Sequence, residues 1–214
     1  AGCSICNWTG SGAAATIGHG LGAAPQTLWV KNRDDTCNWA VYHLSAGFNA
    51  LILNDNLPRQ TTGASKYWND LSHNSTIFNV GDDNTVNGSS DDMVAYAFTE
   101  IPGFSRFGGY HGNSDADGAL VITDFRPSWV MIKVYTATDH WRLFDTARNP
   151  FNQSDNSLAP NLTAIESTSG MPIDILSNGF KIRTADLGLN NNYDYAYWAF
   201  AENPFALASP VTAR

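Results

Sequence analysis

The chain has 214 residues, of which 43% are hydrophobic and only 15% are charged, and its formal net charge is −8. Such a chain can bury a large core, and all-β sandwiches of this length commonly form one domain. The 12 lysines and arginines are outnumbered by 20 acidic residues and form no cluster, which argues against a nucleic-acid partner, and no apolar stretch approaches the roughly 20 residues needed for membrane insertion as a helix.

Strands are predicted along the whole first half, where runs rich in β-branched and aromatic residues are bounded by Gly, Pro, Asn and Asp. The expected strands cover residues 3–8, 27–32, 39–43, 50–53, 76–80 and 93–101. In the second half they cover residues 105–110, 129–135, 141–145, 173–176, 180–183 and 195–201. Because convincing 3.6-residue periodicity is hard to find, the fold class predicted is all-β, a β-sandwich or jelly roll.

The burial of these strands can also be predicted from their composition. Residues 93–98 and 195–200 are near-continuous apolar runs, which is typical of strands covered on both faces. Long polar connections at residues 81–92 and 154–170 predict surface loops, where binding residues are often found. Four tryptophans within strand-like runs are expected in the core: Trp29, Trp39, Trp141 and Trp198.

The two halves carry matching residues at a constant distance of 102 (for example 133 − 31). The matched residues are Pro25, Lys31, Trp39 and Tyr42 in the first half and Pro127, Lys133, Trp141 and Phe144 in the second. This pattern predicts two repeats, residues 1–102 and 103–214, within a single β domain over residues 1–214. The repeats could exchange strands or form two sandwiches in tandem, and the short link at residues 101–104 favours one body.

Several motifs resemble a known family. They include His19-Gly20-Leu21-Gly22 in the first half, and Phe107-Gly108-Gly109-Tyr110-His111-Gly112-Asn113 and Ala199-Phe200-Ala201-Glu202-Asn203-Pro204-Phe205 in the second. The chain resembles, over nearly its whole length, a domain of poorly characterised function found in structural proteins of tailed bacteriophages. The resemblance implies a virion component, most often in tail fibres, that is assembled in the host cytoplasm and exposed on the particle exterior. It also implies other virion proteins as partners and a homo-oligomer, which we expect to be a trimer.

Three cysteines, Cys3, Cys6 and Cys37, leave one thiol unpaired whichever two are joined. The Cys3-x-x-Cys6 spacing matches half of a zinc site, but the chain offers no second pair of ligands at similar spacing. A buried thiol on the first strand is the preferred interpretation. The five histidines show no metal-binding spacing, so neither a metal nor any other cofactor is expected.

Carboxylates suggest two further kinds of chemistry. Glu100 and Glu202 are two of three glutamates, and their matched positions allow a glycosidase-like pair, although both end an apolar run before a proline region, which favours a structural role. Asp115 and Asp117 precede Gly118 as in the start of a calcium loop, but the downstream bidentate acid is missing. A second acidic loop holds Asp82, Asp83, Asp91 and Asp92. Solvated turns explain both loops more simply.

The predicted ligand-binding residues are Tyr67, Trp68, Asn69 and Asp70, which lie in a polar stretch without a counterpart in the second repeat. Exposed aromatic rings stack on sugars or anchor protein contacts. The sequence thus leaves three classes of function. The preferred one is a non-enzymatic virion protein, as a tail-fibre receptor-binding domain or as a decoration protein on the head. The others are a carbohydrate-binding module, which could recognise a host surface glycan, and a glycan hydrolase using Glu100 and Glu202.

Overall fold

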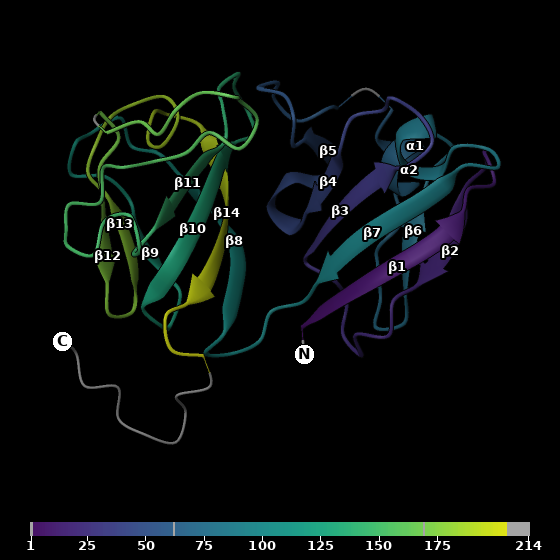
Figure 1. Cartoon of the computed structure of the whole chain (residues 1–214), viewed down its shortest axis with the longest axis horizontal. Coiled ribbons are helices and arrows are strands. Elements are labelled where there is room, and N and C mark those ends of the chain that lie inside the picture. Colours follow the sequence, from purple (N-terminus) through teal and green to yellow (C-terminus); the bar gives the residue numbers. More distant parts are fainter. Residues whose placement is uncertain (1, 62, 169, 205–214) are drawn as a thin grey trace. The chain divides into compact units, whose positions relative to one another are not determined.

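The computed structural model describes residues 2–61, 63–168 and 170–204. Its fold confirms the predicted class, because 41% of the structure is strand and 6% is helix. The chain divides into two compact units, Ala1–Glu100 and Ile101–Arg214, close to the predicted boundary between the repeats. Every sheet lies within one of the two units, so the described residues show no exchange of strands between them (Figure 1). That residues 1–214 behave as one domain stays a prediction.

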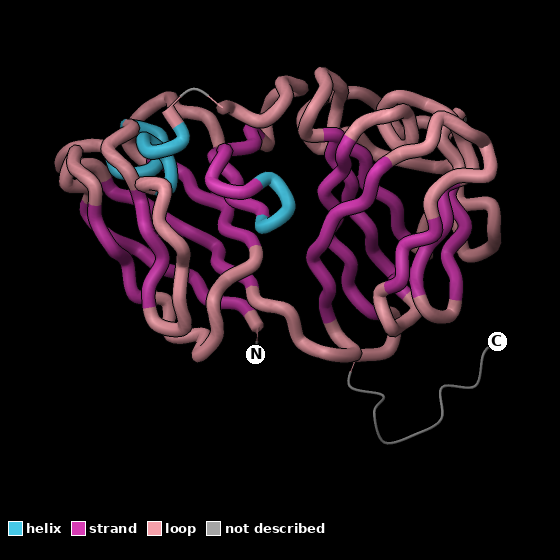
Figure 2. Tube along the Cα trace, turned by 180° about the vertical axis from the view of Figure 1, so that it is seen from behind, coloured by secondary structure: helices cyan, strands magenta, loops and turns pink. Residues whose placement is uncertain are grey.

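The first unit is a sandwich of a five-stranded and a two-stranded sheet. The larger sheet has the order β1-β7-β3-β4-β5, and the smaller one pairs β2 with β6. The bounds are β1 Cys3–Thr9, β2 Ala15–Gly18, β3 Thr27–Asn32, β4 Ala40–His43, β5 Gly47–Ile52, β6 Ile77–Val80 and β7 Asp92–Phe98. A 3-10 turn, η1 Leu44–Ala46, and two short helices, α1 Ala64–Trp68 and α2 Asn84–Asn87, complete it. Figure 2 shows that the helices in the described residues belong to this unit.

The second unit pairs a four-stranded sheet, β11-β10-β14-β8, with a three-stranded one, β12-β13-β9. Its strands are β8 Ser105–His111, β9 Leu120–Ile122, β10 Pro127–Val134, β11 Arg142–Asp145, β12 Ile173–Leu176, β13 Gly179–Ile182 and β14 Asp194–Ala201. Each unit has a separate cluster of buried apolar side chains drawn from both of its sheets. Within the described residues, no helix is long and apolar enough to cross a membrane.

Strand pairing in the second unit follows that in the first at a distance of 102 residues. Cys3↔Phe98 and Thr27↔His43 correspond to Ser105↔Phe200 and Trp129↔Asp145. The distance holds for each position, for example 105 − 3 and 200 − 98. The connection after β4 departs from this rule, because it forms β5 and α1. The described residues between β11 and β12, 146–168 and 170–172, form no named strand. That the common pairing arose by duplication stays an inference.

Several details differ from the sequence-based expectations. Trp141 and Trp198 are buried as predicted, but Trp29 and Trp39 are only half-buried. The polar stretch at residues 81–92 was expected to be a surface loop, yet it forms α2 and buries Val86 and Asn87. The polar composition of this stretch does not reveal that the Asn87 side chain will be buried against the loop that contains Ser11 and Ala13.

Candidate functional site

The predicted ligand-binding stretch lies at the C-terminal end of α1. Trp68 is 0% exposed and packs in the core of the first unit, edge-on to Tyr42 with ring centroids 5.8 Å apart. Its ring therefore has no face open to a ligand in this structure. Tyr67 is half-buried, Asn69 caps the helix in the left-handed conformation, and Asp70 is exposed. Ligand binding by Tyr67, Asn69 and Asp70 stays a prediction.

A buried histidine lies beneath this stretch and was missed by the search for metal-binding spacing. The His73 ring is edge-on to Tyr42 at 4.3 Å and to Trp68 at 6.3 Å between centroids. Its Nδ1 accepts a hydrogen bond from the Asn79 backbone N–H at 3.2 Å, and its Nε2 is buried without a hydrogen-bond partner among the described residues. Burial, with a smaller effect of His19, lowers the pKa of His73 to about 4. The side chain is a neutral part of the core at neutral pH.

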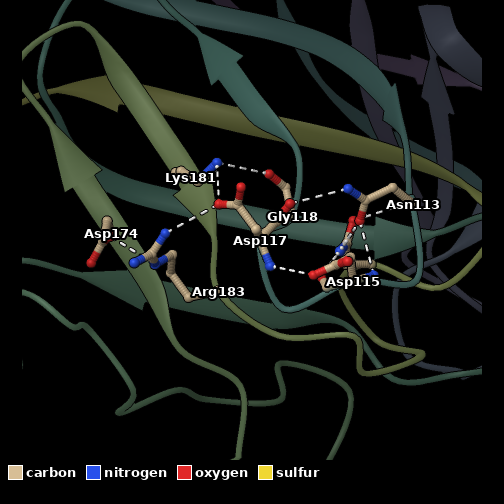
Figure 3. Close-up of polar contacts among 8 residues, drawn as sticks. Asn113, Asp115, Asp117, Gly118, Asp174, Lys181 and Arg183 are labelled. Carbon is tan, nitrogen blue, oxygen red and sulfur yellow. Dashed lines mark hydrogen bonds and ion pairs between the residues drawn. The ribbon is translucent and has the colours of Figure 1, made fainter.

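The candidate calcium loop of the second unit is an ion-paired turn (Figure 3). The Asp117 carboxylate lies 2.8 Å from Lys181 Nζ and 3.4 Å from an Arg183 guanidinium nitrogen, and Arg183 also pairs with Asp174 at 3.1 Å. The hydrogen bond and charge of Lys181, followed by the charge of Arg183, lower the pKa of Asp117. Asp115 accepts the Asp117 backbone N–H at 2.8 Å, as in an ordinary Asx turn. The Asp117 carboxylate is thus engaged by two of the protein's own cations, and the Asp115 carboxylate by a backbone N–H.

The second acidic loop is likewise occupied by structural bonds. Asp83 accepts the Thr85 backbone N–H at 2.9 Å and so caps α2. Asp91 accepts a hydrogen bond from the buried Asn32 side chain at 2.7 Å. In the part of the chain that the structure describes, no group of three or more His, Cys, Asp and Glu side chains is arranged to hold a metal.

The cysteines of β1 lie on opposite faces of the sheet, as residues an odd number of positions apart must. Cys6 is buried in the core, which confirms the buried thiol, whereas Cys3 is exposed and Cys37 is half-buried. All three thiols are free. Because Cys3 and Cys6 point away from each other, the strand cannot present both to one zinc ion.

The matched glutamates belong to different units and have different surroundings. Glu202 follows β14 and forms an ion pair with Arg126 at 3.0 Å. Glu100 lies beyond the end of β7, where its backbone N–H donates to the Gln26 side chain at 2.8 Å. Both contacts lie at the ends of the central strands, and a structural role for the two carboxylates stays a prediction.

Two buried asparagines stabilise equivalent loops and were not singled out from the sequence. Asn87 Nδ2 donates to Ala13 O at 2.5 Å and to Ser11 Oγ at 3.0 Å, while its Oδ1 accepts the Trp8 indole N–H at 3.1 Å. In the second unit, Asn190 Nδ2 donates to Asp115 O at 2.6 Å and to Asn113 Oδ1 at 2.7 Å. Both asparagines are 0% exposed. They are 103 rather than 102 positions apart (190 − 87), so a search at the constant distance does not pair them.

The matched lysines also act on the backbone. Lys133 is fully buried, and its ammonium donates to Val134 O at 2.7 Å and Asp139 O at 2.8 Å. Lys31 donates in the same way to Asn32 O at 2.5 Å and Asp35 O at 3.1 Å. Each lysine holds the turn that follows its strand, so the shared lysine signature is structural.

The connection after β11 contributes to a shallow hollow and also carries exposed apolar side chains. The hollow is lined by Ser128, Trp129, Asp145, Thr146, Ala147 and Arg148. Arg148 bridges Asp145 at 2.7 Å and Glu166 at 2.6 Å, and this partnership raises its pKa. The connection that contains Arg148 also carries Phe151 and Ile165, whose exposures of 81% and 93% are unusually high for apolar residues.

Comparison with known proteins gives a family without an assigned activity. A family model described as "Domain of unknown function (DUF7483)" matches residues 1–204. The chain belongs to this family. The DUF7483 match spans the division between the two units, so the family's domain comprises elements of both. No curated protein and no solved structure matches the chain.

Proposed function

We propose that this DUF7483 chain is a non-enzymatic structural domain of a bacteriophage virion. The observation that carries the proposal is that two of the carboxylates with a possible chemical role are held in ion pairs within their own unit. Asp117 pairs with Lys181 and Arg183, and Glu202 pairs with Arg126. A carboxylate that is paired with a lysine or arginine stabilises the local structure, and it is less available to accept a proton or to bind a metal.

The assignment to a virion rests on the resemblance of the sequence motifs. A structural role of the motif at residues 19–22 supports this assignment, because Gly20 and Gly22 have positive φ values of 65° and 77°. We further propose exposure on the particle exterior, contacts with other virion proteins and assembly as a homo-oligomer. Receptor binding in a tail fibre, with a host surface glycan as ligand, is the preferred task.

The copy number per particle tests this proposal and separates its two forms. Quantitative mass spectrometry of purified particles, combined with antibody labelling in electron micrographs, would locate and count the chain. A few tens of copies or fewer on the tail would support a fibre, and hundreds on the head would support a decoration protein. Absence of the polypeptide from purified particles would refute the virion role.

Glycan binding is tested separately on the purified chain with host surface polysaccharide. Tyr67→Ala removes a half-buried ring of the predicted binding stretch, and Tyr193→Ala removes a partly exposed tyrosine of the other unit as a control. We expect weaker binding for the first variant only. Release of reducing ends by the unmodified chain, lost in Glu100→Gln with Glu202→Gln, would instead establish a hydrolase.

A further inference from the structure

Strand β1 forms an edge of the five-stranded sheet and pairs with β7, beside which it lies in Figure 1. In an antiparallel pair, the backbone groups of successive residues point alternately toward the partner and away from it. Thr99 N–H donates to Gly2 O at 2.9 Å and Gly10 N–H donates to Asp91 O at 2.8 Å, so the even-numbered residues bond to the β7 side. Cys3, Ile5, Asn7 and Thr9 therefore direct their N–H and C=O groups outward.

These four outward-facing residues are also solvent-exposed. Ile5 is 62% exposed, and the side chains of Cys3, Asn7 and Thr9 are exposed as well. Within the described residues, none of the four makes a backbone hydrogen bond with a turn or loop of the chain. The edge thus presents four unpaired donors and four unpaired acceptors along a strand of seven residues.

Soluble proteins usually protect such an edge with charge, proline or a bulge. The sequence of β1, CSICNWT, contains none of the charged residues or prolines that do so. The corresponding edge strand of the second unit, β8, is protected: Arg106 pairs with Asp124 at 3.1 Å and His111 pairs with Asp194 at 2.7 Å. The equivalent edge strands of the two units therefore differ: β8 carries charged side chains that protect its edge, and β1 does not.

We propose that β1 pairs with β1 of a second copy of this chain, antiparallel about a two-fold axis. In such pairing, the strand faces an identical copy of itself. A strand with a net charge would therefore repel its copy, whereas the uncharged β1 does not. All seven residues overlap when Cys3 lies opposite Thr9 of the second copy and Ile5 opposite Asn7. This register forms about eight backbone hydrogen bonds, two for each of four bonded pairs. The inference is independent of the proposed virion role.

Sedimentation equilibrium of the purified chain tests the pairing. In place of the trimer expected from the resemblance, this pairing predicts an assembly with an even number of chains of 23.2 kDa, the smallest being the dimer. Ile5→Lys combined with Asn7→Lys sets like charges opposite each other in this register and should reduce the assembly to half its size. Ile5→Lys combined with Asn7→Glu sets opposite charges against each other and should keep it. Leu120→Lys, which changes a 54% exposed residue on another edge strand, β9, is the matched control and should leave the assembly unchanged.

The register is tested by a spin label on the exposed Cys3, at the end of the paired segment, in a Cys37→Ser background. Cys3 and its symmetry mate are six positions apart along the paired strands (9 − 3), which gives about 20 Å at roughly 3.4 Å per residue. A monomeric chain, a trimer unaffected by the double lysine variant, or a label separation well away from this distance would each overturn the proposal. None of these results bears on the location of the chain in a virion.

Discussion

Lowering the pH should destabilise the first unit through His73, because the unfolded chain binds a proton at this side chain before the folded chain does. The ordinary histidine pKa is 6.5, whereas burial lowers that of His73 to about 4. The stabilising effect of keeping the ring neutral is complete above about pH 6.5 and is lost as the pH falls from 6.5 through 4. The difference of about 2.5 pKa units corresponds to a loss of about 3 kcal/mol in the free energy of unfolding.

The structure gives two reasons for this direction. The ring is enclosed by Tyr42, Trp68 and Phe78, which offer no charge to an imidazolium. Its Nδ1 already accepts the Asn79 N–H, so protonation there would also remove a hydrogen bond. His19, whose ring stacks on Phe78 with centroids 6.3 Å apart, adds repulsion that further lowers the pKa of His73.

The assay is denaturant unfolding at a series of pH values between about pH 7 and pH 4.5, on the unmodified chain and on His73→Asn. Asparagine retains an acceptor near the position of Nδ1 but does not titrate. We expect the variant to lose about 2.5 kcal/mol less over this range than the unmodified chain. Equal pH dependence of the two proteins, or an NMR titration in which His73 protonates near 6.5, would refute the reasoning.

The remaining predictions concern packing and charge. Trp68→Ala should destabilise the first unit by about 3–5 kcal/mol because it empties a fully buried site, whereas Tyr67→Ala should cost much less, as measured by thermal unfolding. Asn87→Ala should lower the stability of the first unit by about 1–3 kcal/mol, since it removes the hydrogen bonds of a buried side chain to Ala13 O and the Trp8 indole. Asn190→Ala should do the same to the second unit only, so hydrogen exchange that loosens both units equally would contradict the separate cores. Asp117→Asn should change stability little, and less still at high salt, because its carboxylate is exposed; a large calcium-dependent rise in melting temperature that this variant abolishes would restore the calcium interpretation.

The burial of Trp68 shows why a predicted contact surface needs the tertiary structure. Its sequence neighbours, Asn69 and Asp70, are polar and occupy the left-handed region that ends a short helix, so the stretch has the composition of a surface loop. One helical turn is enough to direct Trp68 inward, and a five-residue helix is too short to show periodicity. The same limit applies to His73, whose pKa depends on rings brought together from β4, α1 and β6.

The amino-acid sequence by itself determined the all-β class and most strand positions, because alternation and β-branched or aromatic runs act over a few residues. It also carried the constant distance of 102 that the strand pairs of the two units follow. Only the tertiary structure decided which polar groups are enclosed, which acids face a lysine or arginine, and that β1 lies uncharged at the edge of its sheet. Burial and ion pairing arise between residues far apart in the chain, so no local pattern contains them.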